Sequence, residues 1–201
     1  MARLALSKSS LQRERSQLGR FERFLPSLDL KRRQLMAERS TAIEAMAQTE
    51  KELERLRGEI GEKLPMLSNR EVDLTGLVRV VRLEQEIVNR VGVKLPQLNS
   101  VEVEVKDYAL LGRPQWVDVT AAHLKSSAEI AIRAQFERHR LELLRAAVKR
   151  VTQRVNLFDK VLIPRTRRNI KRIQIYLSDA ERAGVVQAKV AKKKRLAEGR
   201  P

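Results

Sequence analysis

The chain has 201 residues, and its 42 Lys and Arg outnumber 25 Asp and Glu, for a formal net charge of +17. Aromatic residues make up only 3% of it, so a thick globular enzyme core, which large aromatic side chains usually dominate, is not expected. It has no Cys, which excludes disulfides and thiolate metal sites and fits a reducing compartment. It also has no run of 18 apolar residues that could span a membrane. With only 8 Gly and 6 Pro, the composition favours long helices with a narrow apolar seam, in a cytoplasmic protein.

Residues 1–63 carry a seven-residue repeat that predicts an N-terminal coiled-coil arm. The first register consists of Leu4, Leu11, Leu18, Leu25, Arg32, Arg39, Met46, Leu53 and Ile60. The second, three residues on, consists of Ser7, Glu14, Phe21, Leu28, Leu35, Ala42, Thr49, Leu56 and Lys63. Pro26 predicts a kink near Leu25, because proline removes a helical hydrogen bond and crowds the preceding turn.

Residues 64–119 are predicted to form a central insert that is not helical. Loops are expected at Leu64-Pro65, at Ser68-Asn69 and at Gly76. Residues 101–105 alternate valine with glutamate, which is typical of a half-buried strand. We therefore expect a β-hairpin over residues 77–110, with Pro96 and Asn99-Ser100 in its turn region.

Residues 120–195 form the second predicted arm, with Thr120 as its expected N-cap, and residues 196–201 form a tail. The apolar stripe of this arm first consists of Leu141, Leu144, Val148, Val151, Val155, Phe158 and Leu162. It then moves to Thr166, Ile170, Ile173, Leu177, Ala180 and Gly184. Two successive four-residue steps and Pro164 coincide at this shift, which predicts a bend or a change of packing partner.

Two arms that flank one small insert can fold back on each other as an antiparallel pair. A parallel homodimer is the alternative, but the comparable lengths of the arms favour the intramolecular pair. A helix of about 55 residues is roughly 80 Å long at its usual rise per residue. The expected fold is therefore mainly α: a long antiparallel two-helix coiled coil, shaped as a rod, with a small central β-hairpin insert.

The positive charge is concentrated in the C-terminal third of the chain. Residues 121–201 hold 21 basic and 7 acidic side chains, whereas residues 64–120 hold 7 and 8. Such a field attracts phosphates, acidic lipids or acidic protein surfaces. A basic leucine zipper would carry its basic region beyond the seam, but here residues 138–172 combine basic side chains with the seam itself. The run at residues 192–195 fits a solvated tail.

The sequence offers no recognisable catalytic constellation. His123 and His139 lack the spacing of a metal site, and neither a G-x-x-x-x-G-K-[ST] loop nor a G-x-G-x-x-G loop is present. Acidic pairs such as Glu50 with Glu54 fit a solvated helix face. We expect a protein that is not an enzyme and needs no cofactor.

Three strings resemble the family formed by the D subunits of V-type and A-type ATPases (ATP synthases), in the family's order along the chain. They lie at residues 28–35, 88–96 and 154–164, and the third, RVNLFDKVLIP, is the most specific. The residues that match the family motifs at the first and third strings and just after them are Leu28, Lys31, Arg32, Arg33, Leu35, Arg154, Val155, Asn156, Ile163, Pro164, Ile170 and Ile173.

The resemblance implies a central-stalk rotor that turns within the catalytic A3B3 hexamer. It also implies binding to the small F subunit and to the C/d-type adaptor on the membrane ring, without insertion into the membrane or binding to nucleic acid. Such a chain is peripheral to the membrane, in the soluble V1/A1 sector.

We expect two sets of partner-binding residues in this chain. The basic set, expected to face stator or partner surfaces, consists of Arg138, Arg145, Lys149, Arg150, Arg167, Arg168 and Lys171. The hairpin set consists of Val91, Gly92, Val93 and Pro96. Two other classes stay open at this point: a basic coiled-coil protein that binds nucleic acid, and a coiled-coil adaptor of an export apparatus.

Overall fold

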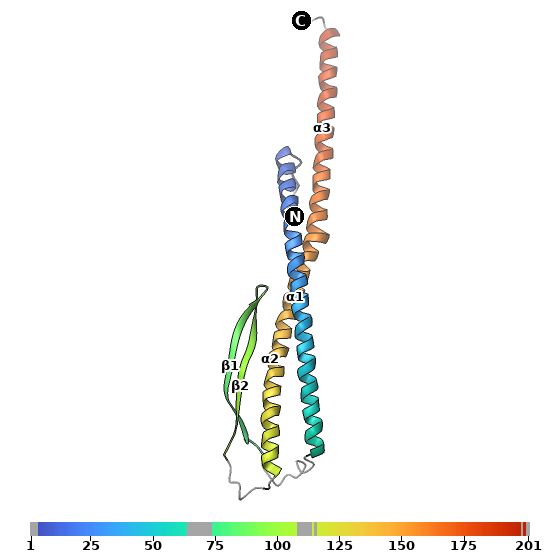
Figure 1. The fold of residues 1–201 in the computed structure, drawn as a ribbon. Coiled ribbons are helices and arrows are strands. Elements are labelled where there is room, and N and C mark those ends of the chain that lie inside the picture. The colour runs from blue at the N-terminus through green and yellow to red at the C-terminus, as the bar shows by residue number, and fades with distance from the viewer. Residues whose placement is uncertain (1–3, 64–73, 108–113, 115, 198, 200–201) are drawn as a thin grey trace. The chain divides into compact units, whose positions relative to one another are not determined.

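A computed structural model describes residues 4–63, 74–107, 114, 116–197 and 199. Helix α1 spans Lys8–Lys63, and strands β1 (Val78–Arg90) and β2 (Val93–Val105) follow it. Helix α2 (Trp116–Asn156), the π-helical segment η3 (Leu157–Leu162) and helix α3 (Ile163–Ala197) then succeed one another without a gap (Figure 1). Two long helical stretches with a two-stranded hairpin between them confirm the predicted fold class.

The chain divides into two compact units. Unit 1 combines residues 1–31 with residues 151–201, and unit 2 is residues 32–150. The residues predicted at Leu64-Pro65, at Ser68-Asn69 and at the end of the hairpin range, 108–110, lie outside the described part of the chain.

The predicted heptad seam of α1 is confirmed by the burial of its side chains. Every position of the two registers is buried or half-buried except Lys63, which is the last residue of the helix. In the second arm the stripe from Leu141 to Leu162 is likewise buried or half-buried throughout. Helix α1 continues through Pro26.

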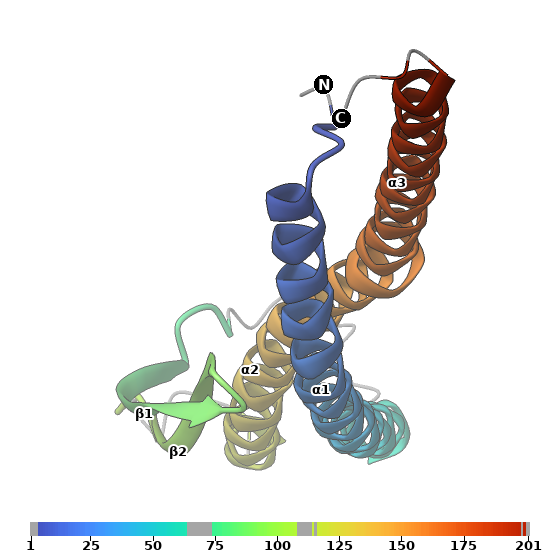
Figure 2. The ribbon, with the colours of Figure 1, turned by 90° about the horizontal axis from the view of Figure 1, so that it is seen from above.

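In unit 2 the helices run antiparallel. Glu38, Glu50 and Glu52 of α1 pair with Arg140, Arg138 and Arg133 of α2 at 3.7, 3.4 and 3.5 Å, so that the order along one helix is reversed on the other. The hairpin lies beside α2, on the side away from α1 (Figures 1 and 2). Its base packs on the start of α2 in a cluster of Leu77, Val117 and Ala121, bordered by Leu74, Val78, Val105, Trp116 and Leu124.

In unit 1, polar contacts also join the two helices in antiparallel order. Lys8 lies 3.7 Å from Glu181, and Asn169 donates a hydrogen bond of 3.3 Å to Glu14. Buried side chains on the α3 side include Ile163, Thr166 and Ile173. The expected stripe stops there, however: Leu177 is half-buried, but Ala180 and Gly184 are exposed. Because α1 begins only at Lys8, the described chain offers no helix that could cover them.

The hairpin exists as predicted, but its turn was predicted in the wrong place. The two central residues are Val91 and Gly92, with φ of 53° and 75°, between the paired residues Arg90 and Val93. Positive φ at both positions defines the type I′ turn that suits the twist of a two-residue hairpin. Pro96 lies instead within β2, opposite Ile87.

Asn99 is the extra residue of a β-bulge, where the pairing shifts between Glu84–Ser100 and Gln85–Leu98. Bulges insert an unpaired residue that re-aims its neighbours. The polar pair Asn99-Ser100, which was predicted in the turn, therefore lies at an irregularity inside a strand.

The expected N-cap of the second arm is also wrong. Helix α2 begins at Trp116, and Thr120, 1% exposed, lies inside its first turns. Its hydroxyl donates a hydrogen bond of 2.9 Å to the carbonyl of Trp116. The helix starts earlier because Trp116 and the fully buried Val117 pack against the base of the hairpin.

Candidate partner-binding surfaces

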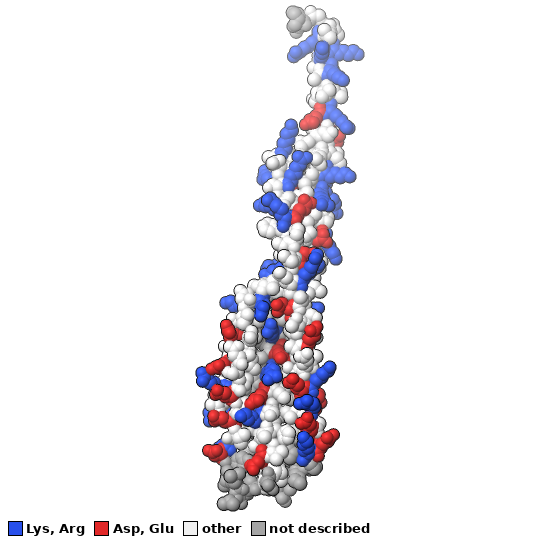
Figure 3. All heavy atoms as spheres, in the orientation of Figure 1, with Lys and Arg blue, Asp and Glu red and all other residues white. Residues whose placement is uncertain are grey.

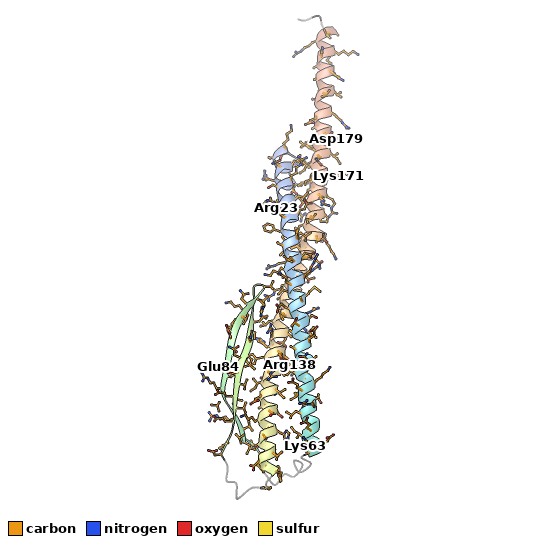
Figure 4. The ribbon with its side chains drawn as sticks, viewed as in Figure 1. Arg23, Lys63, Glu84, Arg138, Lys171 and Asp179 are labelled. Atoms are coloured by element: carbon orange, nitrogen blue, oxygen red, sulfur yellow. The ribbon has the colours of Figure 1, made fainter. Side chains whose placement is uncertain are left out.

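The predicted basic residues of unit 2 lie on α2 and are exposed, beside a buried seam. Arg145 and Lys149 are four residues apart and so share one face of the helix. Arg150 is exposed next to them, and its Nε donates to the carbonyl of Ala146 at 3.4 Å. Arg138, whose position is labelled in Figure 4, donates to Glu50 at 3.4 Å and is therefore partly neutralised within the chain.

The predicted basic residues of unit 1 are exposed on α3. Arg167 donates to Glu22 of α1 at 2.8 Å, whereas Arg168 and Lys171 make no ion pair among the described residues. Arg167 and Lys171 are four residues apart, so they share one face, and Arg168 lies beside them. The structure thus divides the predicted basic set into two groups, one in each unit.

The net charge differs strongly between the two units. Unit 1 contains 21 Lys and Arg and 7 Asp and Glu, a net charge of +14, whereas unit 2 contains 21 and 18, a net charge of +3. Figure 3 shows Lys and Arg crowding the end of α3, while both signs are interspersed over the helices and hairpin of unit 2. An acidic partner surface is therefore attracted mainly to unit 1.

The end of α3 is the most exposed part of the described chain. All residues from Asp179 to Ala197 are exposed. Four large aliphatic side chains in this segment are 49–74% exposed: Val185, Val186, Val190 and Leu196. The helix includes the first two residues of the predicted tail, 196 and 197, and it carries a basic, partly apolar surface.

The predicted hairpin residues lie together at and below the turn. Val91 is half-buried and Gly92 is exposed, whereas Val93 and Pro96 belong to β2 and are half-buried. Val91 is the one described residue other than glycine with positive φ. A β-branched side chain in that region is strained.

A cleft of about 300 Å³ between β2 and α2 was not predicted from the sequence. It is lined on the strand side by residues 96–101, which include the bulge, and on the helix side by Glu129, Arg133, Phe136, Glu137 and Arg140. Glu137 Oε2 and Arg140 Nε are buried there, with no hydrogen-bond partner among the described residues. The polar pair Asn99-Ser100, which was predicted in the turn, is the one sequence feature that coincides with this cleft.

The family-motif residues belong mostly to the seam. Leu35 and Ile173 are 0% exposed, and Val155 and Ile163 are 6% exposed, while Leu28, Lys31, Arg32, Pro164 and Ile170 are half-buried. Arg33, Arg154 and Asn156 are exposed. Most of the family-motif residues therefore take part in helix packing.

The described part of the chain contains neither a candidate metal site nor a candidate membrane-spanning helix. Within residues 4–63, 74–107 and 116–197, no three His, Asp or Glu side chains are grouped so that they could hold a metal ion. None of the described helices combines the length and the apolar character that crossing a membrane requires.

Comparison with known proteins decides the family. The family model that describes the D subunit of ATP synthase matches residues 10–193. This chain belongs to that ATP synthase family. It is 32% identical over 192 residues to the V-type ATP synthase D subunit of Borreliella burgdorferi, covering 96% of this chain and 95% of the relative. It is 34% identical over 198 residues to the V-type ATP synthase D subunit of Chlamydia trachomatis, covering 96% of each chain. The family match spans both helical stretches and the hairpin, so the whole described architecture belongs to the family.

Proposed function

We propose that this chain is the central rotor of a V-type or A-type rotary ATPase. In this role it couples rotation of an ion-driven membrane ring to ATP synthesis or hydrolysis in a catalytic A3B3 hexamer, and it is not itself catalytic. It works in the soluble V1/A1 sector on the cytoplasmic side, bound to the F subunit and to the C/d-type adaptor. Membership of the D-type family, whose relatives are parts of V-type ATP synthases, supports a place in this machine.

The observation that carries the proposal is the antiparallel helix pair. A rotor has to carry torque, and the seam of α1, whose heptad positions are buried or half-buried up to Ile60, resists twisting because it packs against the partner helices. Ion pairs between α1 and α2 in unit 2, and between α1 and α3 in unit 1, add charged contacts beside that seam.

The exposed basic side chains are proposed to face the stator. Charge attraction acts at a distance and is screened by salt, so it guides and holds a turning shaft without locking it to one stator contact. Arg145, Lys149 and Lys171 suit this role best, because they are exposed and form no ion pair among the described residues.

The hairpin is proposed as a second partner-binding element. Its strand β1 is exposed at nearly every position, and Ile87 is 69% exposed. An exposed strand edge carries unpaired backbone groups that a partner can bind.

The direct test is a pull-down of the full-length chain against a purified A3B3 hexamer, with and without the F subunit. We expect a stable complex with the hexamer, and recovery of the F subunit with this chain even when the hexamer is absent. Failure to bind either partner would overturn the proposal. A gel shift with duplex DNA at moderate salt tests the nucleic-acid alternative, since binding through phosphates weakens steeply as salt rises.

A further inference from the structure

The second arm of unit 1 contains a π-helical turn, Leu157–Leu162, between two α-helices. The N–H of Ile163 donates to the carbonyl of Phe158, five residues earlier, instead of the usual four. Pro164 follows at once, and because it has no N–H, the α-helical bond to the carbonyl of Lys160 cannot form. None of the six residues in this turn is buried.

The first arm of unit 1 is weakened as well. Pro26 lies inside α1, so the α-helical bond to the carbonyl of Glu22 cannot form. The hydroxyl of Ser27 donates a hydrogen bond of 2.8 Å to the carbonyl of Phe24 and so leaves the carbonyl of Glu22 without a replacement for that bond. Proline and π-turns are two of the common causes of bending in helices.

The two irregularities meet at one level of the helix pair. The rings of Phe21 and Phe158 are in edge-to-face contact, with centroids 5.4 Å apart and planes at 90°. Glu22 directly follows Phe21, and Lys160 comes two residues after Phe158. The carbonyl end of each missing α-helical bond is therefore within two residues of a ring in this aromatic contact.

Packing on either side of this level is tighter than at it. The seam residues Val151 and Val155 are buried before the level, and Ile163 and Thr166 are buried after it, whereas Phe158 and Leu162 at the level are only half-buried. The Arg167–Glu22 ion pair spans the level, but its side chains are 65% and 44% exposed. Exposed pairs of this kind contribute little to stability.

We infer that the level of Phe21 and Phe158 is a flexure within unit 1. Here both helices bend or twist more easily than elsewhere along the seam, while the edge-to-face rings keep them in contact. A flexure of this kind stores twist between the loaded and the relaxed rotor, and this mechanical role rests on the proposed function. The flexure itself does not, because it is a property of the isolated chain.

Hydrogen exchange of the full-length chain, followed by mass spectrometry, tests the inference. Amides in residues 22–28 and 157–163 should exchange at least about tenfold faster than amides in residues 141–151, since local opening is easiest where packing and hydrogen bonds are fewest. The variants Pro26→Ala and Pro164→Ala should each slow exchange in their own arm, because alanine restores the N–H and has high helix propensity. Pro96→Ala, in β2, is the matched control and should leave both segments unchanged.

Equal protection along residues 141–177 overturns the inference, and so does fast exchange at residues 157–163 that Pro164→Ala does not slow. Circular dichroism of each variant, expected to retain full helicity, separates a local effect from loss of fold. The outcome is independent of the pull-down described above: a chain that does not bind the hexamer removes the rotor proposal and leaves the exchange result standing.

Discussion

The turn of the hairpin offers the sharpest test of how this structure stores strain. Val91 has φ of 53°, a conformation that costs roughly 1–2 kcal/mol for a residue with a Cβ. Asparagine tolerates this region better, and Asn-Gly is the preferred pair of a type I′ turn. The substitution also removes the apolar side chain of Val91, which is half-buried. This loss costs about half of the roughly 1.5 kcal/mol that full burial of a valine side chain contributes to stability. We therefore expect Val91→Asn to stabilise the hairpin by roughly 0.3–1 kcal/mol in total.

The assay is hydrogen exchange of the strand amides, which should slow by roughly two- to fivefold in Val91→Asn, because 1.4 kcal/mol corresponds to a factor of ten. Val93→Asn is the matched control: the same chemical change two residues away, in a strand with a half-buried side chain. There asparagine should speed exchange, since it is disfavoured in strands. If Val91→Asn also speeds exchange, the strain argument is wrong and the contacts of Val91 decide the stability of the turn.

Leu35→Ala, at a fully buried seam position, should lower the free energy of unfolding, measured by urea titration, by roughly 2–5 kcal/mol. Leu30→Ala, at a position that is 58% exposed, should change it little. Equal effects of the two variants would contradict the assigned seam. Gly92→Ala, at φ of 75°, should destabilise the hairpin by about 1 kcal/mol, seen as faster exchange in residues 78–105, and unchanged exchange would contradict the type I′ turn. Replacing the exposed residues Arg145, Lys149 and Arg150 by glutamine should slow association with an A3B3 hexamer and make the association rate less dependent on salt. The thermal unfolding midpoint should stay the same. Association at the wild-type rate would contradict their proposed role.

The seam was predictable because it depends on a local repeat. An apolar side chain every three and four residues is buried in whatever helix packs beside it, so α1 could be assigned without knowledge of its partner. Even the polar seam positions Arg32, Arg39 and Thr49 are half-buried or buried, as their register requires. The strand at residues 101–105 follows from the same kind of local pattern.

The errors arose where a residue type has two structural uses. Pro96 and Asn99-Ser100 are typical turn residues, yet one lies in a strand and the others at a bulge, while the real turn uses Val91, which propensity disfavours. Thr120 is a good N-cap by type, but packing of Val117 against Leu77 extends the helix beyond it. The cleft between β2 and α2 could not be predicted, because it depends on how a hairpin sits on a helix.

The distribution of charge shows what pairing in three dimensions adds to a linear count. Along the sequence, the C-terminal third carried the positive excess, and residues 121–150 contributed to it together with residues 151–201. In the structure, residues 121–150 belong to unit 2, where the acidic residues of α1 and the hairpin offset them, and Glu38, Glu50 and Glu52 do so by direct contact. Residues 151–201 instead join residues 1–31, which are themselves basic, so the excess adds up in unit 1. Raising the salt concentration should therefore weaken contacts made by unit 1 more than contacts made by unit 2, because the larger net charge gives a larger electrostatic attraction to lose.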